Sequence, residues 1–246
     1  MKKASVILAA LIAAMPLAAE NPKPFTVPEV RQWVAASGIS FTPGAETRIV
    51  CRDKAMLQAA EALADGYAEL TGVRLEVVTG KPAKGDISFA GGGKTARKTP
   101  EGYAIEITPE GVAVKANDEA GARWAAQTIL QLTETSPALP CGRITDWPDY
   151  RFRGFMLDCG RKYIPIDYLY KLVDVLAHYK MNILQIHLND NGFKYFYDDD
   201  WDKTQAAFRL ESERFPQLTA RDGSYTKEEF KALQRYALKR LELLLR

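Results

Sequence analysis

The residues best suited to chemistry follow two apolar stretches in the second half of the chain. Asp158 and Arg161 come directly after FRGFML, and His187 and Asp190 lie in LQIHLNDNGF. If both stretches are parallel strands, their carboxyl ends meet at one edge of the sheet, where sites assemble in β/α folds. An Arg offers a planar fork of donors and an Asp accepts hydrogen bonds, which suits sugar hydroxyls. We therefore predict that Arg161, His187 and Asp190 bind substrate from one rim.

The same residues also have structural interpretations. Arg161 and Asp158 can form an ion pair that only ties the loop down, and position alone favours neither alternative. A lone His near a strand end is more often a packed residue than a catalyst. Aromatic residues downstream fit either a sugar-stacking surface or the small core of a long loop; they are Tyr195, Phe196, Tyr197 and Trp201.

Two further segments resemble known binding motifs but lack residues that those motifs require. Gly93–Thr95 imitates the end of a phosphate loop, but Ser88 stands where the first glycine of that motif belongs. The alternating aspartates of Asp198–Asp202 imitate a calcium loop, yet Lys203 replaces the turn glycine and Arg209 replaces the closing glutamate. We therefore expect no nucleotide site at Gly93–Thr95 and a solvated acidic turn at Asp198–Asp202.

Hydrophobic periodicity predicts the elements of the first half of the chain. A compact layer of strands covered by two helices is expected; Gly72 stops the first helix, and the layer ends near Thr135. An apolar stripe of Ala122, Ala126, Ile129 and Leu130 places the second helix on the sheet. The expected strands are residues 47–51, 74–78, 86–90, 103–107 and 111–116, and the expected helices are residues 54–70 and 119–132.

A second unit follows a connection. Residues 136–150 hold three prolines without periodicity, which indicates a link between domains. Strand, helix and strand are then predicted at 152–157, 166–179 and 183–187, and Thr226 with Glu229 has the spacing of a capping box before another helix. The tail with Leu238, Leu241 and Leu245 either continues that helix or replaces a third strand. The order predicts an α/β fold, a small α/β sandwich domain followed by an incomplete (β/α)8 barrel.

Composition agrees with two folded domains and excludes some partners. The chain has 246 residues, 47% of them hydrophobic and 26% charged, which is ordinary for a globular protein. Lys and Arg total 33 against 31 for Asp and Glu, and the basic residues are not clustered, so we expect no nucleic-acid partner.

The first residues and the cysteines bear on location. Residues 1–19 contain two lysines, an apolar run and small residues, the pattern of a secretory signal peptide, and the run is shorter than the roughly 20 residues of a membrane span. A periplasmic or secreted product that no longer contacts the membrane is expected. Three cysteines allow at most one disulfide and have no metal-site spacing, so buried small hydrophobic residues are the favoured interpretation; they are Cys51, Cys141 and Cys159.

Three stretches together resemble glycoside hydrolase family 20, the β-N-acetylhexosaminidases. RFRGFMLDCGRKYIP resembles the first barrel strand and its loop, HYKMNILQIHLNDNGF the second, and DGSYTKEEFKALQRYALKR the helix before the third. The preceding region, with EGYAIEI and GARWAAQTILQL, is similar to the small domain ahead of that barrel. After the expected signal peptide at residues 1–19, the resemblance implies the small domain at 23–145 and the start of the barrel at 146–246.

The resemblance also implies a reaction and roles for residues. Arg161 matches the family arginine that holds hydroxyls of the terminal sugar, Asp190 matches an acidic site residue, and His187 matches the histidine of the second strand. Asn191 stands where the family commonly has a second acid. The implied partners are glycans ending in N-acetylglucosamine or N-acetylgalactosamine, cleaved with help from the substrate's own acetamido group and without a cofactor.

The catalytic residues are expected elsewhere. The family's Asp-Glu pair follows its third strand, beyond residue 246, so none of these residues is predicted to be catalytic and the truncated chain is expected to be inactive alone. Glu211 and Glu213 are poor substitutes, because Arg209 and Arg214 beside them favour solvent ion pairs. The alternative to an enzyme is a non-catalytic carbohydrate-binding or vestigial protein.

Overall fold

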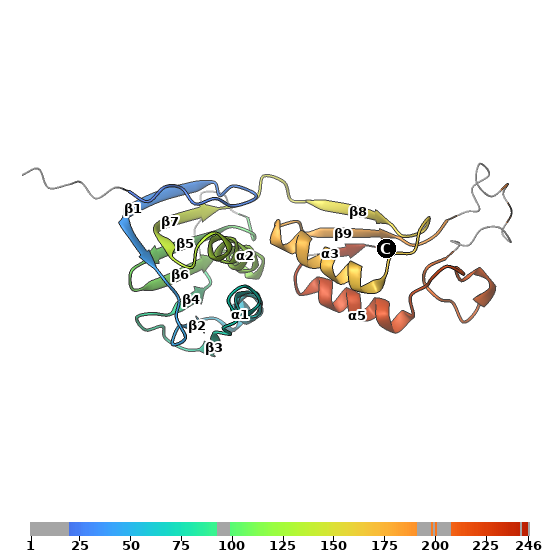
Figure 1. Cartoon of the computed structure of the whole chain (residues 1–246), viewed down its shortest axis with the longest axis horizontal. Helices are drawn as coiled ribbons and strands as arrows, with labels where there is room; N and C mark the ends of the chain where they lie inside the picture. Colours follow the sequence, from blue (N-terminus) through green and yellow to red (C-terminus); the bar gives the residue numbers. More distant parts are fainter. Residues whose placement is uncertain are drawn as a thin grey trace, which may run out of the picture.

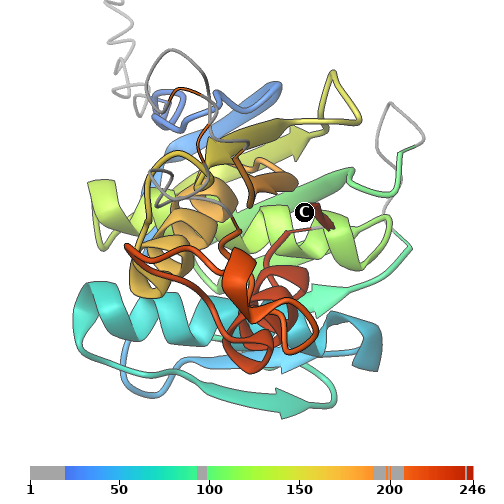
Figure 2. The same ribbon diagram turned by 90° about the vertical axis from the view of Figure 1, so that its right-hand side faces the viewer.

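The computed structural model describes residues 20–92, 99–190, 198, 200, 208–241 and 243–245. The chain forms two units side by side, with the sheet of the first unit at one end and a smaller β/α unit at the other (Figure 1). In Figure 2 the second unit lies in front of the first. Both units match the predicted α/β class, and each has its own buried cluster of apolar side chains.

The first unit is a mixed sheet of seven strands in the order β1-β7-β5-β6-β4-β2-β3. Strand β2 pairs in parallel with β3 and β4, and β4 pairs in parallel with β6. Strand β5 is antiparallel to both of its neighbours, β6 and β7. The strands are β1 (Gln32–Phe41), β2 (Arg48–Cys51), β3 (Glu76–Thr79), β4 (Ile87–Ala90), β5 (Tyr103–Thr108), β6 (Gly111–Ala116) and β7 (Leu139–Asp146).

Two helices cover the face of this sheet that is turned toward the second unit (Figure 1). After the short turn η1 (Lys54–Met56), α1 (Leu57–Thr71) ends at Gly72, whose φ of 77° closes the helix in the left-handed conformation. In α2 (Glu119–Thr135) the predicted apolar stripe is buried. The two predicted helices and their packing on the sheet are confirmed.

The predicted connection at residues 136–150 is wrong in its first part. Leu139–Asp146 is strand β7, which pairs with β5 and with β1. Strand β1 was not predicted at all, although its ten residues form one edge of the sheet. The first unit therefore ends after β7 and not at the end of α2, and its final strand lies between strands that precede it by about 30 and 100 residues in sequence.

The second unit begins as a parallel β/α fold. Strand β8 (Gly154–Asp158) leads through α3 (Ile166–His178) to β9 (Ile183–His187), and the two strands pair in parallel. After the turn η2 (Pro216–Leu218), α5 (Lys227–Leu238) starts with the predicted capping box of Thr226 and Glu229. The tail forms a third strand, β10 (Leu243–Leu245), parallel to β9, so of the two alternatives for this segment the strand is confirmed.

Alternating side chains divide the β8–β9 sheet into two faces. Leu184 and Ile186 are fully buried toward α3 and α5, together with the predicted helix positions Leu169, Val173 and Leu176. Gln185 and His187 point the other way and are exposed. None of the described helices covers that second face.

The three cysteines are buried free thiols, as expected of small core residues. Within the described ranges, no helix combines the length and the apolar character that a membrane crossing requires. The proposed signal peptide, residues 1–19, lies outside the described part of the chain, as do Gly93–Thr95.

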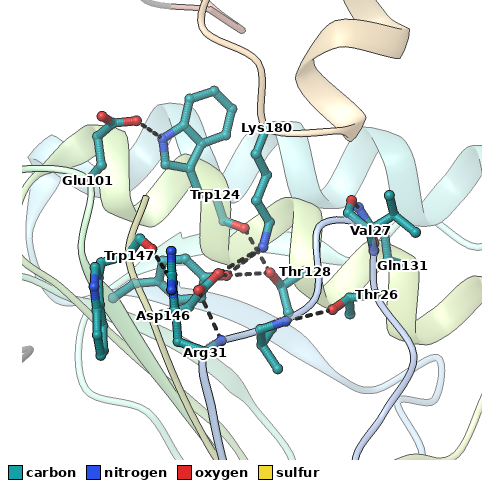
Figure 3. A network of polar contacts seen from close by, with 12 residues as sticks. Thr26, Val27, Arg31, Glu101, Trp124, Thr128, Gln131, Asp146, Trp147 and Lys180 are labelled. Carbon is teal, nitrogen blue, oxygen red and sulfur yellow. Dashed lines mark hydrogen bonds and ion pairs between the residues drawn. The ribbon is translucent and has the colours of Figure 1, made fainter. Parts of the chain in front are cut away.

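A lysine from the second unit is buried in the first (Figure 3). Lys180, in the turn between α3 and β9, is 5% exposed, and its Nζ donates to the Tyr103 hydroxyl at 2.8 Å and to Asp146 Oδ2 at 3.0 Å. The Tyr103 hydroxyl donates to the same carboxylate oxygen and contacts Thr128 Oγ1, each at 2.6 Å. Burial lowers the pKa of the Lys180 ammonium, and the neighbouring Asp146 carboxylate opposes that shift.

Other polar side chains extend this interface. Arg153, just before β8, pairs with the buried Glu101 carboxylate, which also accepts from Trp124 Nε1 at 2.8 Å. From α2, Arg123 donates to the Leu241 carbonyl at 3.0 Å and Gln131 donates to the His178 carbonyl at 2.7 Å. Polar residues on both sides therefore fix the second unit against α2.

Breaking the Lys180 pair should destabilise the protein strongly. Lys180→Met leaves the Asp146 carboxylate buried beside no cation, and we expect a loss of about 3–5 kcal/mol in the free energy of unfolding, measured with urea. The backbone φ of 57° at position 180 is equally unfavourable for Lys and Met, so it does not enter the comparison. Adding Asp146→Asn removes the uncompensated charge and should recover part of the loss. A double variant as unstable as the sum of the two single variants would contradict this account.

Candidate functional site

The candidate site lies where β8 and β9 end. Asp158, the last residue of β8, is in register with His187, the last residue of β9. The hydrogen bonding between the two strands continues one residue past Asp158, because the Cys159 amide donates to the His187 carbonyl at 2.9 Å. Arg161 and Asp190 follow three residues after the two strand ends. The parallel strands thus bring the three predicted residues to one edge of the sheet; their role in binding stays a prediction.

Arg161 contacts the carboxylate of Asp158. Its amide donates to Asp158 Oδ1 at 3.2 Å, and its Nε lies 3.7 Å from Asp158 Oδ2. The side chain is 69% exposed. An exposed ion pair contributes only about 0–1 kcal/mol, so the contact with Asp158 by itself costs little to break. The ion pair that the sequence suggested exists, and it does not exclude binding.

His187 borders a hollow on the surface, whereas Arg161 and Asp190 are not among the residues that line it. His187 is exposed, so it is not the packed core histidine of the structural interpretation, and Asp190 is half-buried. A hollow of about 550 Å³ opens beside the end of β9; it is bordered by His187, Asn189, Phe208 and Glu211, among others. A cavity of about 440 Å³ between the two units lies at the opposite, amino end of the strands, beside Arg153 and Lys180.

The two rim loops approach each other at a glycine. A Cβ atom added to Gly160 would lie 2.5 Å from the Asn189 carbonyl oxygen, which is closer than real Cβ atoms come. The loop after β8 and the loop after β9 therefore touch backbone to backbone. Only glycine permits this spacing between the segments that carry Arg161 and Asp190.

The acidic residues of the long connection behave differently from the prediction. Arg209 is not in a solvent ion pair with Glu211 or Glu213: its side chain is completely buried and pairs with Asp222. Glu211 accepts from the Ser224 hydroxyl at 2.9 Å, and Glu213 pairs with Lys227 at 3.2 Å. The expected solvent ion pair exists for Glu213, with Lys227 as its partner. The expectation was wrong for Arg209, because backbone carbonyls and Asp222 bind its guanidinium in the interior.

Some predicted features cannot be placed. Asn191, the downstream aromatic residues 195–197 and 201, and Asp202 lie outside the described residues. In the part of the chain that is described, no group of three or more His, Cys, Asp or Glu side chains is arranged to hold a metal ion.

Comparison with known proteins identifies both units. Residues 23–147 match the family described as "Glycosyl hydrolase family 20, domain 2", and residues 150–241 match "Glycosyl hydrolase family 20, catalytic domain". A beta-hexosaminidase of Akkermansia muciniphila is 33% identical over 144 residues, which are 57% of this chain and 29% of that protein. An N,N'-diacetylchitobiase of Vibrio harveyi is 36% identical over 119 residues, 48% of this chain and 12% of that protein.

Solved structures show the same arrangement. A mutant Streptomyces plicatus beta-hexosaminidase in complex with its product GlcNAc has a TM-score of 0.71 and 26% identity, over 90% of this chain and 45% of that one. The beta-N-acetylhexosaminidase of Streptomyces coelicolor has a TM-score of 0.72 and 25% identity, over 91% and 46%. The chain thus spans less than half the length of these relatives.

The fold and the family matches define the class of this protein, a small α/β domain ahead of a partial β/α barrel of the glycosyl hydrolase type. Within that class, the chain belongs to glycosyl hydrolase family 20, as its resemblance to the hexosaminidases implied.

Substitution at the contact between the rim loops should be costly. Gly160→Ala forces a methyl group against the Asn189 carbonyl, and because both groups belong to backbone segments, we expect a loss of about 1–3 kcal/mol in urea unfolding, typical of overpacking. Gly44→Ala is the matched control, since a Cβ there has no neighbour within 4 Å. Equal stabilities for the two variants would show that the loops are not in contact.

Proposed function

We propose that this chain provides the sugar-binding start of a β-N-acetylhexosaminidase, an enzyme that removes terminal β-linked N-acetylglucosamine or N-acetylgalactosamine from glycans. The observation that carries the proposal is the position of Arg161 and Asp190 on two rim loops that touch at Gly160. Family membership and the relatives named for hexosaminidase and chitobiase activity support it.

The chemistry of the rim suits a neutral polyol. The Arg161 guanidinium can donate two parallel hydrogen bonds to adjacent hydroxyls, and the Asp190 carboxylate can accept from a hydroxyl of the same ring. His187, exposed at the end of β9, adds a donor or an acceptor beside the hollow. Such a set recognises hydroxyl positions on a terminal sugar and needs no cofactor.

The bond cleavage is assigned by family resemblance. In substrate-assisted catalysis the 2-acetamido oxygen attacks the anomeric carbon, an Asp stabilises that group, and a neighbouring Glu protonates the leaving oxygen. We place this Asp-Glu pair outside residues 1–246. A general acid works from a sheltered position at the glycosidic oxygen, whereas Glu211 and Glu213 are exposed and occupied by Ser224 and Lys227. We also propose export to the periplasm or beyond, directed by residues 1–19.

Sugar binding should depend on Arg161. Arg161→Ala removes the paired hydrogen bonds, so the affinity of the chain for N-acetylglucosamine, followed by ligand-observed NMR, should fall by on the order of 2–5 kcal/mol. Arg151→Ala is the control, because Arg151 is also exposed but lies before β8, at the opposite end of the strand. Unchanged binding by Arg161→Ala, or equal losses in both variants, would refute the proposed site.

Turnover separates an enzyme from a binding protein. We expect the purified 246-residue chain to bind the sugar and to leave a chromogenic N-acetylglucosaminide intact, since general acid catalysis alone contributes roughly 10²- to 10⁴-fold. Size-exclusion chromatography should accompany the assay, because Phe155 and Met156 are 43% and 57% exposed on the edge strand β8 and favour association. If a monodisperse sample turned the substrate over and Asp190→Ala abolished that turnover, the general acid would have to lie within residues 1–246.

A further inference from the structure

We propose that Arg209 is a positioning residue, which holds the loop after β8 in the conformation that presents Arg161. The inference rests on the proposed function of Arg161 in sugar binding, and it deepens that function by naming what orients the binding residue. Arg209 lies 48 residues further along the chain, and its side chain is completely buried, so it cannot touch a sugar itself. Any effect on binding must pass through the groups to which it donates.

The Arg209 guanidinium joins two loops by side-chain hydrogen bonds. Toward the loop after β8, Nε donates to the Cys159 carbonyl at 2.5 Å and an Nη donates to the Gly160 carbonyl at 3.1 Å. Toward the loop before α5, the other Nη donates to the Gly223 carbonyl at 2.9 Å, and both Nη atoms bond the Asp222 carboxylate. The two carbonyls at 159 and 160 immediately precede Arg161.

The Arg209 backbone is hydrogen-bonded to the segment after β9. Its amide donates to the Leu188 carbonyl at 2.8 Å, just after β9, and its carbonyl accepts from the Tyr225 amide at 2.6 Å. One residue therefore contacts the segments on either side of the Gly160–Asn189 approach. The loops that carry Arg161 and Asp190 are therefore both bonded to Arg209, the first through its guanidinium and the second through its backbone amide.

The choice of residue fits this role. A guanidinium has five N–H donors in a rigid plane, and here it meets two carbonyls on one side and a carbonyl with a carboxylate on the other. Lysine can supply neither the plane nor the number of donors. Asp222 neutralises the charge, so the cation can be buried while its remaining donors serve backbone carbonyls.

The test compares two variants of this network with a matched control. Arg209→Lys keeps the charge and removes the planar fork, whereas Asp222→Asn keeps Arg209 and weakens its hold. Arg214→Lys is the control: Arg214 lies five residues away in the same segment, is exposed, and packs over the Phe215 ring. All proteins are measured well below the unfolding midpoint of the least stable variant.

Two measurements are made on each protein. The first is the rate at which Cys159 reacts with an aromatic disulfide reagent. Cys159 lies in the loop after β8 and is fully buried. The internal references are Cys51 and Cys141, which are both buried in the first unit. The second is the affinity for N-acetylglucosamine by ligand-observed NMR. Unfolding of the whole chain exposes all three thiols together, and unfolding of the second unit exposes Cys159 at a rate that rises steeply with urea, whereas a displaced loop exposes Cys159 at a rate that depends little on urea.

We expect Arg209→Lys to accelerate the reaction of Cys159 by about tenfold or more relative to Cys51 and Cys141, and to weaken sugar binding by about tenfold. Asp222→Asn should shift both quantities in the same direction by less, and Arg214→Lys should shift neither. Unchanged protection of Cys159 overturns the proposal, as does equal exposure of all three thiols. If the unmodified chain binds no sugar, the proposed function fails, and the thiol rates alone still decide whether Arg209 positions the loop.

Discussion

The buried ammonium of Lys180 is the contact on which the arrangement of the two units depends. A charge inside a protein is tolerable only when it is paired and fully hydrogen-bonded, and here both partners, Tyr103 and Asp146, belong to the sheet of the first unit. If the turn between α3 and β9 left that sheet, Lys180 would lose its hydrogen bonds with Tyr103 and Asp146, and a shift that kept either charge buried would leave it unpaired. Arg153 and Glu101 impose the same condition on the residue before β8. Both rim-bearing strands are thus fixed at their amino ends.

Anchoring one end of a strand determines the position of the other. Strands β8 and β9 have five residues each, about 17 Å at 3.3 Å per residue, and their register is unbroken from Gly154 and Ile183 to Asp158 and His187. A displacement at the interface would therefore move the rim as a rigid edge. Binding groups need to be held within about 0.5 Å, and the short loops that carry Arg161 and Asp190 start from these fixed strand ends. The first domain thereby contributes to the site without contacting it.

Local pattern in the sequence was sufficient for part of this fold. Alternation and helical spacing identified β8, α3 and β9 and the capping box at Thr226, because those elements bury one face against neighbours close in the chain. They missed β1 and β7, whose pairing joins residues about 100 positions apart. Pro140 in particular argued against a strand, yet it lies beside the irregular step in the register between Ala35 and Ser40, where a missing amide is tolerated.

The residues of the candidate site also fall into those that local sequence pattern predicts and those that it does not. Arg161, His187 and Asp190 could be found because a polar residue after an apolar strand has a positional meaning in β/α folds. Arg209 could not, since an arginine next to glutamates in a long connection has the sequence context of a solvent-exposed charge. What buries Arg209 is a set of carbonyls at the end of another strand, and what buries Lys180 is a carboxylate in another domain. In this chain apolar periodicity builds each element, while isolated cations join elements distant in sequence, and composition gives no sign of which cations these are.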